Sequence, residues 1–105
     1  MGPDGHTCSL FPGHDLFTNA SSQTRIVLPI SDSPKPPPQR VTLTLNYVRN
    51  SRNLVFFACG AGKADMIKRI LVDKDESLPS TMAAPKSATG VLKWFVDKDA
   101  AKYLA

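Results

Sequence analysis

Cysteine is scarce in this 105-residue chain, which contains only Cys8 and Cys59. Neither belongs to a C-x-x-C motif, so the sequence has no pattern typical of a structural zinc site or a redox-active disulfide. Cys59 follows an apolar run, and we expect it to be a small buried hydrophobic residue. Unpaired thiols are typical of the reducing cytoplasm, so we expect a cytoplasmic protein.

The sequence also lacks a long apolar run. No stretch approaches the about 20 residues that a membrane-spanning helix needs, and no basic segment followed by an apolar one marks a signal peptide. The net charge of +4 is spread along the chain, and its densest basic piece, Lys68-Arg69, is too short for a nucleic-acid patch. We therefore expect neither a membrane nor nucleic acid as a partner. A small anionic ligand suits this charge balance.

The length predicts one domain with a modest core. β-branched and apolar residues predict strands, and apolar residues at helical spacing or capping residues predict helices. The expected strands are residues 25–30, 40–45, 53–58 and 90–96, and the expected helices are residues 7–11, 46–51, 63–73 and 97–104. Alternation of strands and helices predicts an α/β fold with a mainly parallel sheet flanked by helices.

Three other segments have distinct compositions. The uninterrupted apolar run at residues 53–58 predicts a strand that is buried on both faces. The proline-rich residues 33–38 predict an extended polyproline connector. Residues 18–24 and 75–87 are polar or contain proline, and we expect surface loops there.

Asp4-Gly5-His6 is the first candidate for chemistry. A carboxylate two residues before an imidazole can orient the ring, and histidine is the side chain best suited to proton transfer near neutrality. Glycines beside it, including Gly5, allow close backbone approach, and we expect their N–H groups to face a developing oxyanion. The alternative is a turn histidine without a catalytic role.

Gly60-Ala61-Gly62-Lys63 lies between a predicted buried strand and a predicted helix. The N-terminus of a helix offers free N–H groups and a positive dipole end to a phosphate, and Lys63 adds a positive charge there. The segment is not a P-loop, because Phe57 stands where that motif requires its first glycine. The alternative is a solvated lysine in a first helical turn.

Arg40 begins a predicted strand directly after the proline run, where a rigid backbone suits bidentate phosphate binding. The alternative is a surface arginine at a strand end. Lys35 either lines a site or keeps the proline loop soluble, and we expect His14 to be solvated rather than catalytic. We expect Trp94 and Phe95 to belong to the core. No His, Cys and carboxylate set has metal-ligand spacing.

Three stretches occur in the same order as in one enzyme family: GPDGHTCSLFPGH, then ISDSPKPPPQRVTLTL, then the GAGKA turn followed by LKWFVDKDAA. The chain resembles the C-terminal part of the 6-phosphogluconolactonase family, within the glucosamine-6-phosphate deaminase-like superfamily. The resemblance covers nearly all 105 residues. It implies a NagB/RpiA-like fold that lacks its N-terminal half, with residues 1–105 forming a single partial domain.

The resemblance implies hydrolysis of 6-phospho-D-glucono-1,5-lactone to 6-phosphogluconate in the pentose phosphate pathway, without a metal or an organic cofactor. His6 matches the family's catalytic histidine, which activates water, and Asp4 matches the acidic residue of the same motif. Arg40 matches a substrate-phosphate arginine. Lys63 lies where related deaminases place a phosphate-binding lysine.

Members of this family are more than twice as long, and their N-terminal half supplies further strands, a glycine-rich substrate loop and another basic contact. We therefore expect association with a missing N-terminal segment, and apolar surface exposed at residues 53–58 in its absence. Two other functions stay open. One is a truncated, non-catalytic paralogue that binds a sugar phosphate or a partner chain, and the other is an isomerase or deaminase of the same superfamily.

Overall fold

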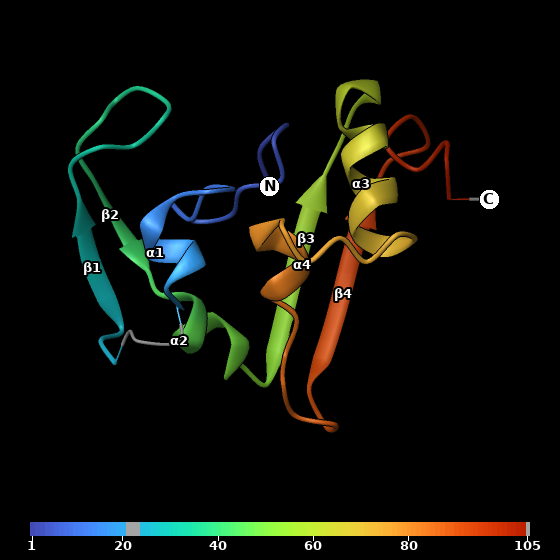
Figure 1. Ribbon diagram of the computed structural model, residues 1–105. Coiled ribbons are helices and arrows are strands. Elements are labelled where there is room, and N and C mark those ends of the chain that lie inside the picture. Colours follow the sequence, from blue (N-terminus) through green and yellow to red (C-terminus); the bar gives the residue numbers. More distant parts are fainter. Residues whose placement is uncertain (21–23, 105) are drawn as a thin grey trace.

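The computed structural model describes residues 1–20 and 24–104. Its elements are α1 (Asp15–Thr18), β1 (Val27–Ile30), β2 (Arg40–Leu43), α2 (Leu45–Arg49), β3 (Asn53–Ala58), the 3-10 helix η2 (Ala61–Lys63), α3 (Ala64–Leu71), α4 (Pro79–Met82) and β4 (Val91–Val96). Within the described residues, the strands form two sheets, β1–β2 and β3–β4. The N-terminal segment lies between these two sheets (Figure 1).

β3 and β4 are parallel and pair in register from Asn53↔Val91 to Ala58↔Val96. The chain leaves β3 through η2 and α3 before it returns as β4, which is the right order for parallel strands joined by a helical crossover. Ile67 on the apolar stripe of α3 packs with Ala58 of β3 and with Ala100. The predicted α/β class is therefore confirmed, and the helix over residues 63–73 forms mostly as α3.

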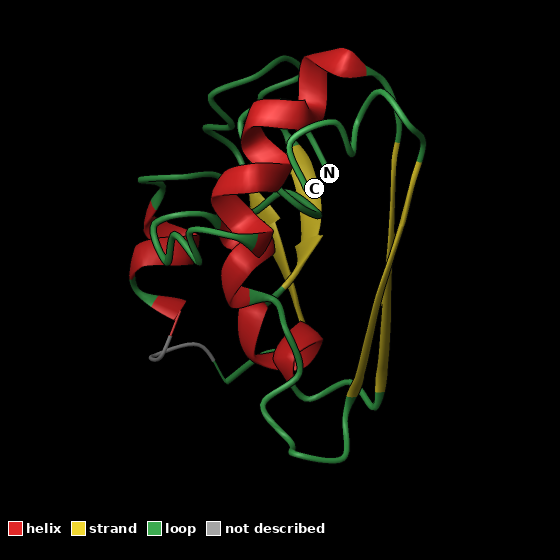
Figure 2. Cartoon of the chain, turned by 90° about the vertical axis from the view of Figure 1, so that its right-hand side faces the viewer, coloured by secondary structure: helices red, strands yellow, loops and turns green. Residues whose placement is uncertain are grey.

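One face of the β3–β4 sheet is open. Figure 2 shows helices on one side of the long β3–β4 pair and none on the other. Val55, Phe57 and Phe95 point to this open face and are 44%, 71% and 51% exposed, and the two phenylalanine rings stack at 5.1 Å. The expectation that residues 53–58 are buried on both faces is wrong, because alternate residues of a strand face opposite sides and helices cover only one face of this pair. The apolar surface that we expected to be exposed at these residues is present.

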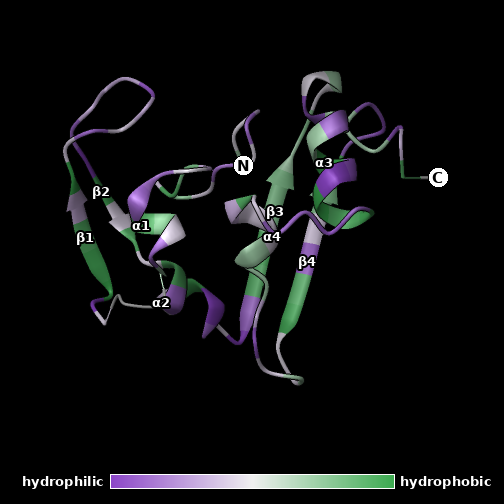
Figure 3. Ribbon diagram, in the orientation of Figure 1, coloured by the Kyte–Doolittle hydropathy of each residue, from purple (hydrophilic) through white to green (hydrophobic). Residues whose placement is uncertain are grey.

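The same alternation corrects two other expectations. Cys59 is exposed rather than buried, since it continues the Phe57 side of the strand while Ala58 faces the core. Phe95 is exposed, whereas Trp94 stacks on the buried Phe56 at 4.2 Å and packs against the core as expected. Figure 3 shows that β3 and β4 are largely hydrophobic in composition, although only one of their faces is covered.

β1 and β2 form an antiparallel hairpin, with Val27↔Leu43 and Ile30↔Arg40 as the outer pairs. The predicted strands at residues 25–30 and 40–45 both form, but they pair with each other rather than join the parallel sheet. Residues 33–38 fold back as the hairpin loop, closed by a 3.1 Å bond from the Ser33 N–H to the Pro38 carbonyl. The expected extended connector is therefore wrong, because the two strands it joins are neighbours.

The remaining helix predictions are mixed. The helix over residues 46–51 appears as α2, and α4 forms inside the predicted loop at residues 75–87. Residues 97–104 form turns instead of a helix, although the Asp97 carboxylate accepts from the Ala100 N–H as a helix cap would. Residues 7–11 contain a tight turn between Thr7 and Leu10, and the helix forms later as α1.

Leu10 and Phe11, which follow the N-terminal turn, are fully buried. The core at this end joins Leu10 to Leu45 and Val48 of α2 and to Phe56 of β3. The predicted loop at residues 18–24 lies partly outside the described residues. In the part of the chain that the structure describes, no helix has the length and apolar character to cross a bilayer.

Candidate functional site

The Gly2–Thr7 segment is a tight turn closed by its own backbone. The Gly5 N–H donates to the Gly2 carbonyl at 3.1 Å, and the Gly2 N–H donates to the His6 carbonyl at 2.9 Å. Gly5 has a φ of +83°, a conformation that favours glycine. Both glycine N–H groups are therefore used inside the turn, and Gly5 is buried. The expectation that they face an oxyanion is not met.

Asp4 and His6 form a close side-chain pair within this turn. His6 Nδ1 lies 2.5 Å from Asp4 Oδ1, and the same oxygen accepts from the His6 backbone N–H at 3.2 Å. Partial burial raises the pKa of the Asp4 carboxyl, but the hydrogen bonds from His6 outweigh it and leave the pKa below its ordinary value. An ionised Asp4 fixes Nδ1 as the protonated nitrogen and leaves the Nε2 lone pair available for chemistry.

Hydrophobic packing limits the freedom of the His6 ring. The ring of Phe11 lies 4.5 Å from the His6 ring, centroid to centroid, with a tilt of 32° between them. Phe11 is fully buried, and the His6 side chain is 19% exposed. The imidazole is thus packed against the core through Phe11 and remains partly exposed to solvent.

Ser80 anchors the turn from a distant part of the sequence. Its buried hydroxyl donates to the Gly5 carbonyl at 2.8 Å, and its backbone N–H donates to the same oxygen at 3.1 Å. Space beside Gly5 is filled by side chains of Leu78 and Met66. The sequence contains no local signal for this role, because Ser80 lies in a segment predicted as a loop, far from residues 4–6.

The hairpin loop brings two basic residues to the same place. Lys35 Nζ lies 3.8 Å from Asp4 Oδ2, so this lysine lines the site. Arg40 lies over the Phe11 ring at 5.3 Å from its centroid. Its Nε and Nη2 groups donate to the carbonyls of Pro37, Lys35 and Pro36, which holds the loop in its folded shape. Arg40 therefore has a structural task in addition to any contact with a ligand.

Lys63 reaches the turn from the other side. Its Nζ donates to the Met1 carbonyl at 2.8 Å, so the lysine lies next to the N-terminal segment that carries His6.

The Gly60 N–H is bonded to the carboxylate of Asp97, with distances of 3.0 and 3.1 Å to its two oxygens. These bonds lower the pKa of Asp97, after the larger effect of the Ala100 N–H. Gly60 consequently does not offer its N–H to a phosphate.

His14 has a structural role and is not solvated as expected. Its side chain is only 12% exposed. Nδ1 accepts from the Leu16 N–H at 3.2 Å and so caps α1, while Nε2 lies 2.9 Å from Asp32 Oδ1. This histidine ties α1 to the start of the hairpin loop. Of the two histidines in the chain, His6 is the one with a nitrogen left for chemistry.

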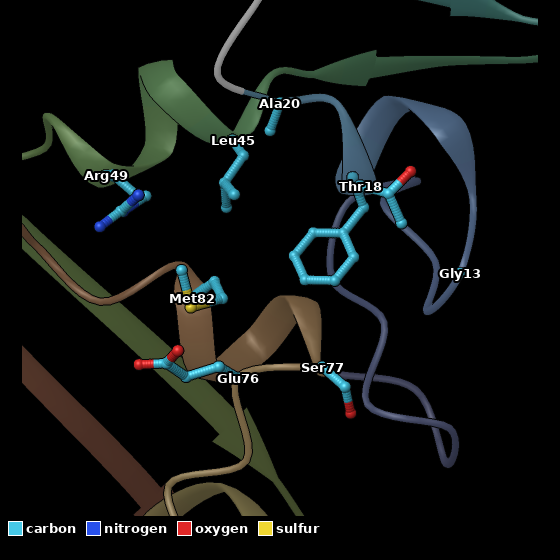
Figure 4. A pocket seen from close by; sticks show the side chains of 9 residues that line it. Gly13, Thr18, Ala20, Leu45, Arg49, Glu76, Ser77 and Met82 are labelled. Carbon is cyan, nitrogen blue, oxygen red and sulfur yellow. The ribbon is translucent and has the colours of Figure 1, made fainter.

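A pocket of about 500 Å³ lies elsewhere, between α1, α2 and α4. Figure 4 shows Leu45 from α2 and Met82 from α4 on its walls. None of the predicted site residues lines this pocket. Proton-transfer geometry lies at the Asp4–His6 turn, so we take that turn as the candidate site. Within residues 1–20 and 24–104, no cluster of three or more His, Cys, Asp or Glu could hold a metal ion.

Comparison with known proteins gives a consistent result. Residues 1–94 match the family described as glucosamine-6-phosphate isomerases/6-phosphogluconolactonase. The chain is 53% identical to a 6-phosphogluconolactonase of Rattus norvegicus over 105 residues, and 54% identical to one of Homo sapiens. These alignments cover 100% and 99% of this chain but 39% of each relative. The chain thus spans about two fifths of the length of the curated relatives it matches.

Solved structures agree with the sequence matches. A 6-phosphogluconolactonase from Trypanosoma brucei superposes with a TM-score of 0.78 at 30% identity, over 100% of this chain and 40% of that one. One from Thermotoga maritima gives a TM-score of 0.68 at 32% identity, over 93% of this chain and 40% of that one. The overall arrangement of this chain is therefore shared with these proteins.

Proposed function

Because the chain belongs to the glucosamine-6-phosphate isomerase/6-phosphogluconolactonase family, we propose that it carries the catalytic part of a 6-phosphogluconolactonase. The proposed reaction is the hydrolysis of 6-phospho-D-glucono-1,5-lactone to 6-phosphogluconate. The observation that carries the proposal is the 2.5 Å pair of Asp4 and His6 in an ordered, partly accessible turn. Free thiols at Cys8 and Cys59 suit the cytoplasm as the site of the reaction.

His6 acts as the general base. With Nδ1 engaged by Asp4, the Nε2 lone pair takes a proton from water while the water oxygen bonds to the lactone carbonyl carbon. The tetrahedral oxyanion then collapses, the bond from that carbon to the ring oxygen breaks, and the imidazolium returns the proton to the departing oxygen. Asp4 stabilises the positive ring between these steps, because its lowered pKa keeps it ionised.

Basic residues around the turn suit the phosphate of this substrate. Lys35 lies beside Asp4, Lys63 lies beside Met1, and Arg40 lies over Phe11. Among the described residues, no hydrogen bond uses Nη1 of Arg40, so this group is the part of the guanidinium that we assign to the phosphate. A cationic cluster of this kind attracts an anionic sugar phosphate and orients it for attack.

We further propose that the open face of the β3–β4 sheet is a docking surface for the rest of the family fold. The chain spans about two fifths of its relatives, and Phe57 and Phe95 form an exposed aromatic stack on that face. Exposed apolar patches of this kind mark interaction sites. In this proposal, a polypeptide that supplies the remaining strands and helices of the family fold covers this face and completes the substrate pocket.

Loss of the lactone tests the proposal. The rate is measured for the chain alone, for buffer, and for the chain mixed with the segment of the Rattus norvegicus relative that it does not match. Excess loss with the chain alone shows autonomous catalysis, and excess loss only in the mixture shows that the docked segment is required. If neither the chain alone nor the mixture exceeds the buffer rate, the proposed hydrolysis is wrong. Ammonia released from glucosamine 6-phosphate would instead indicate a deaminase.

A further inference from the structure

Gly2 lies directly against the imidazole of His6. A Cβ placed on Gly2 would overlap Cε1 and Nδ1 of the His6 ring and would lie 2.9 Å from Nε2. Real Cβ atoms do not approach other atoms this closely, so an alanine at position 2 requires the ring or the turn to move. The overlap is greatest at the edge that carries Nδ1, the nitrogen paired with Asp4.

The two glycines of the turn are needed for different reasons. Gly5 is held at a positive φ, which disfavours any side chain. No positive φ occurs at Gly2, so the conflict does not come from its backbone conformation, and the three atoms nearest to the added Cβ all belong to the His6 ring. The ring cannot retreat freely, because Phe11 packs against it at 4.5 Å and is itself fully buried.

We infer that Gly2 is a positioning residue: the absence of a side chain at position 2 creates the space in which the His6 ring lies flush with the turn and pairs with Asp4. The inference rests on the proposed function for its catalytic meaning, since the Asp4–His6 pair sets which ring nitrogen is free to take a proton. A side chain at position 2 displaces Nδ1 from Asp4 and releases the ring from this single tautomer.

The test compares Gly2→Ala with Gly62→Ala in the full 105-residue chain. Gly62 is the matched control, because a Cβ there meets nothing within 4 Å and its φ is not positive. Two-bond proton–nitrogen correlation spectra, recorded in buffer alkaline enough to hold the imidazoles neutral, report the tautomer of each histidine. His14 serves as an internal reference, because it is the other histidine of the chain and is held by Leu16 and Asp32.

We expect the Nδ1–H tautomer at His6 in the wild type and in Gly62→Ala, and a shift towards Nε2–H in Gly2→Ala with His14 unchanged. The Asp4 carboxyl, followed by its carbon resonance, is expected to titrate closer to its ordinary value of 3.8 in Gly2→Ala, because its hydrogen bond from His6 is lost. A wild-type tautomer and an unchanged Asp4 titration in Gly2→Ala would overturn the inference.

A second measurement keeps the inference testable if Gly2→Ala folds poorly. Thermal unfolding is compared for His6→Ala and for the double variant Gly2→Ala with His6→Ala. Because the conflict is with the ring, removing the ring is expected to abolish the loss of Tm caused by alanine at position 2. An equal loss of Tm in both backgrounds contradicts a contact with His6. Neither the tautomer measurement nor the thermal unfolding requires turnover. A failure of this inference can therefore be distinguished from a failure of the proposed hydrolysis.

Discussion

Substitution of Ser80 by alanine removes one of the two hydrogen bonds that fasten the Gly2–Thr7 turn to α4. Ser80 is 3% exposed, and its hydroxyl donates to the Gly5 carbonyl at 2.8 Å. The carbonyl keeps a second donor in Ser80→Ala, because the backbone N–H of residue 80 also bonds to it at 3.1 Å. The variant therefore loses one buried hydrogen bond without leaving the acceptor unsatisfied.

The expected loss of stability in Ser80→Ala is that of one hydrogen bond. A net intramolecular hydrogen bond between neutral groups contributes about 1 kcal/mol to the free energy of unfolding. For a domain of this size, about 1 kcal/mol corresponds to a fall in Tm of about 4–8 °C. We also expect slower lactone hydrolysis in Ser80→Ala, because Gly5 directly precedes His6 and a looser turn positions the ring less well.

Urea unfolding measures the change in stability. Trp94 is the single tryptophan and stacks on Phe56 in the core, so its fluorescence reports unfolding. Ser87→Ala is the matched control, because Ser87 is exposed and its hydroxyl bonds locally to Thr89, two residues away. We expect the control to change stability by less than about 0.5 kcal/mol. An unchanged midpoint in Ser80→Ala, or an equal loss in the control, would refute the anchoring role of Ser80.

Three further predictions concern stability and surface. Hydrogen bonds from Ser77 and Arg69 lower the pKa of Asp75 from 3.8 to about 2. The ionised Asp75 carboxylate therefore contributes stability to the folded chain above pH 3.8, and this contribution is lost as the pH falls through about 2. Asp75→Asn is thus expected to lower Tm at neutral pH but not below pH 2; an equal loss at both pH values contradicts this. Thr44→Ala removes the N-cap of α2 together with the bond from the Thr44 hydroxyl to the Arg25 carbonyl, and is expected to cost about 1 kcal/mol or more in urea unfolding; no change would refute both contributions. Phe57→Lys is expected to reduce self-association in light scattering without lowering Tm, because Phe57 is 71% exposed; a large loss of Tm would show that Phe57 is buried after all.

The local elements could be predicted because their signals are local. The strands around residues 25–30, 40–45, 53–58 and 90–96 all form, since each has β-branched or apolar residues over its length. Which strands pair, and which of their side chains are buried, depends on elements that are distant in the sequence, so a local stretch of residues does not reveal it. The apolar run at β3 indicates a strand, and exposed apolar surface was expected there, but which of its residues are exposed follows from the uncovered face, which leaves Phe57 and Cys59 accessible.

The contacts of the candidate site could likewise be predicted only where they are local in the sequence. Asp4 and His6 are two residues apart, so their pairing follows from the sequence, and the hairpin brings Lys35 to Asp4 as one of the two expected possibilities. Ser80 escaped prediction because its contact with the turn is between residues far apart in sequence. The role of Gly2 also could not be predicted, because a glycine required by a turn and one required by a neighbouring ring look identical in a sequence.

Lactone loss above the spontaneous rate, compared for His6→Asn and His14→Asn, tests whether His6 is the catalytic base. The chain contains only these two histidines, and asparagine at position 14 can still cap α1. All variants are measured in whichever form is active, the chain alone or the chain with the added segment. General-base catalysis predicts a fall of about 100-fold or more in His6→Asn and a wild-type rate in His14→Asn. A wild-type rate in His6→Asn would contradict the assignment of His6 as the catalytic base.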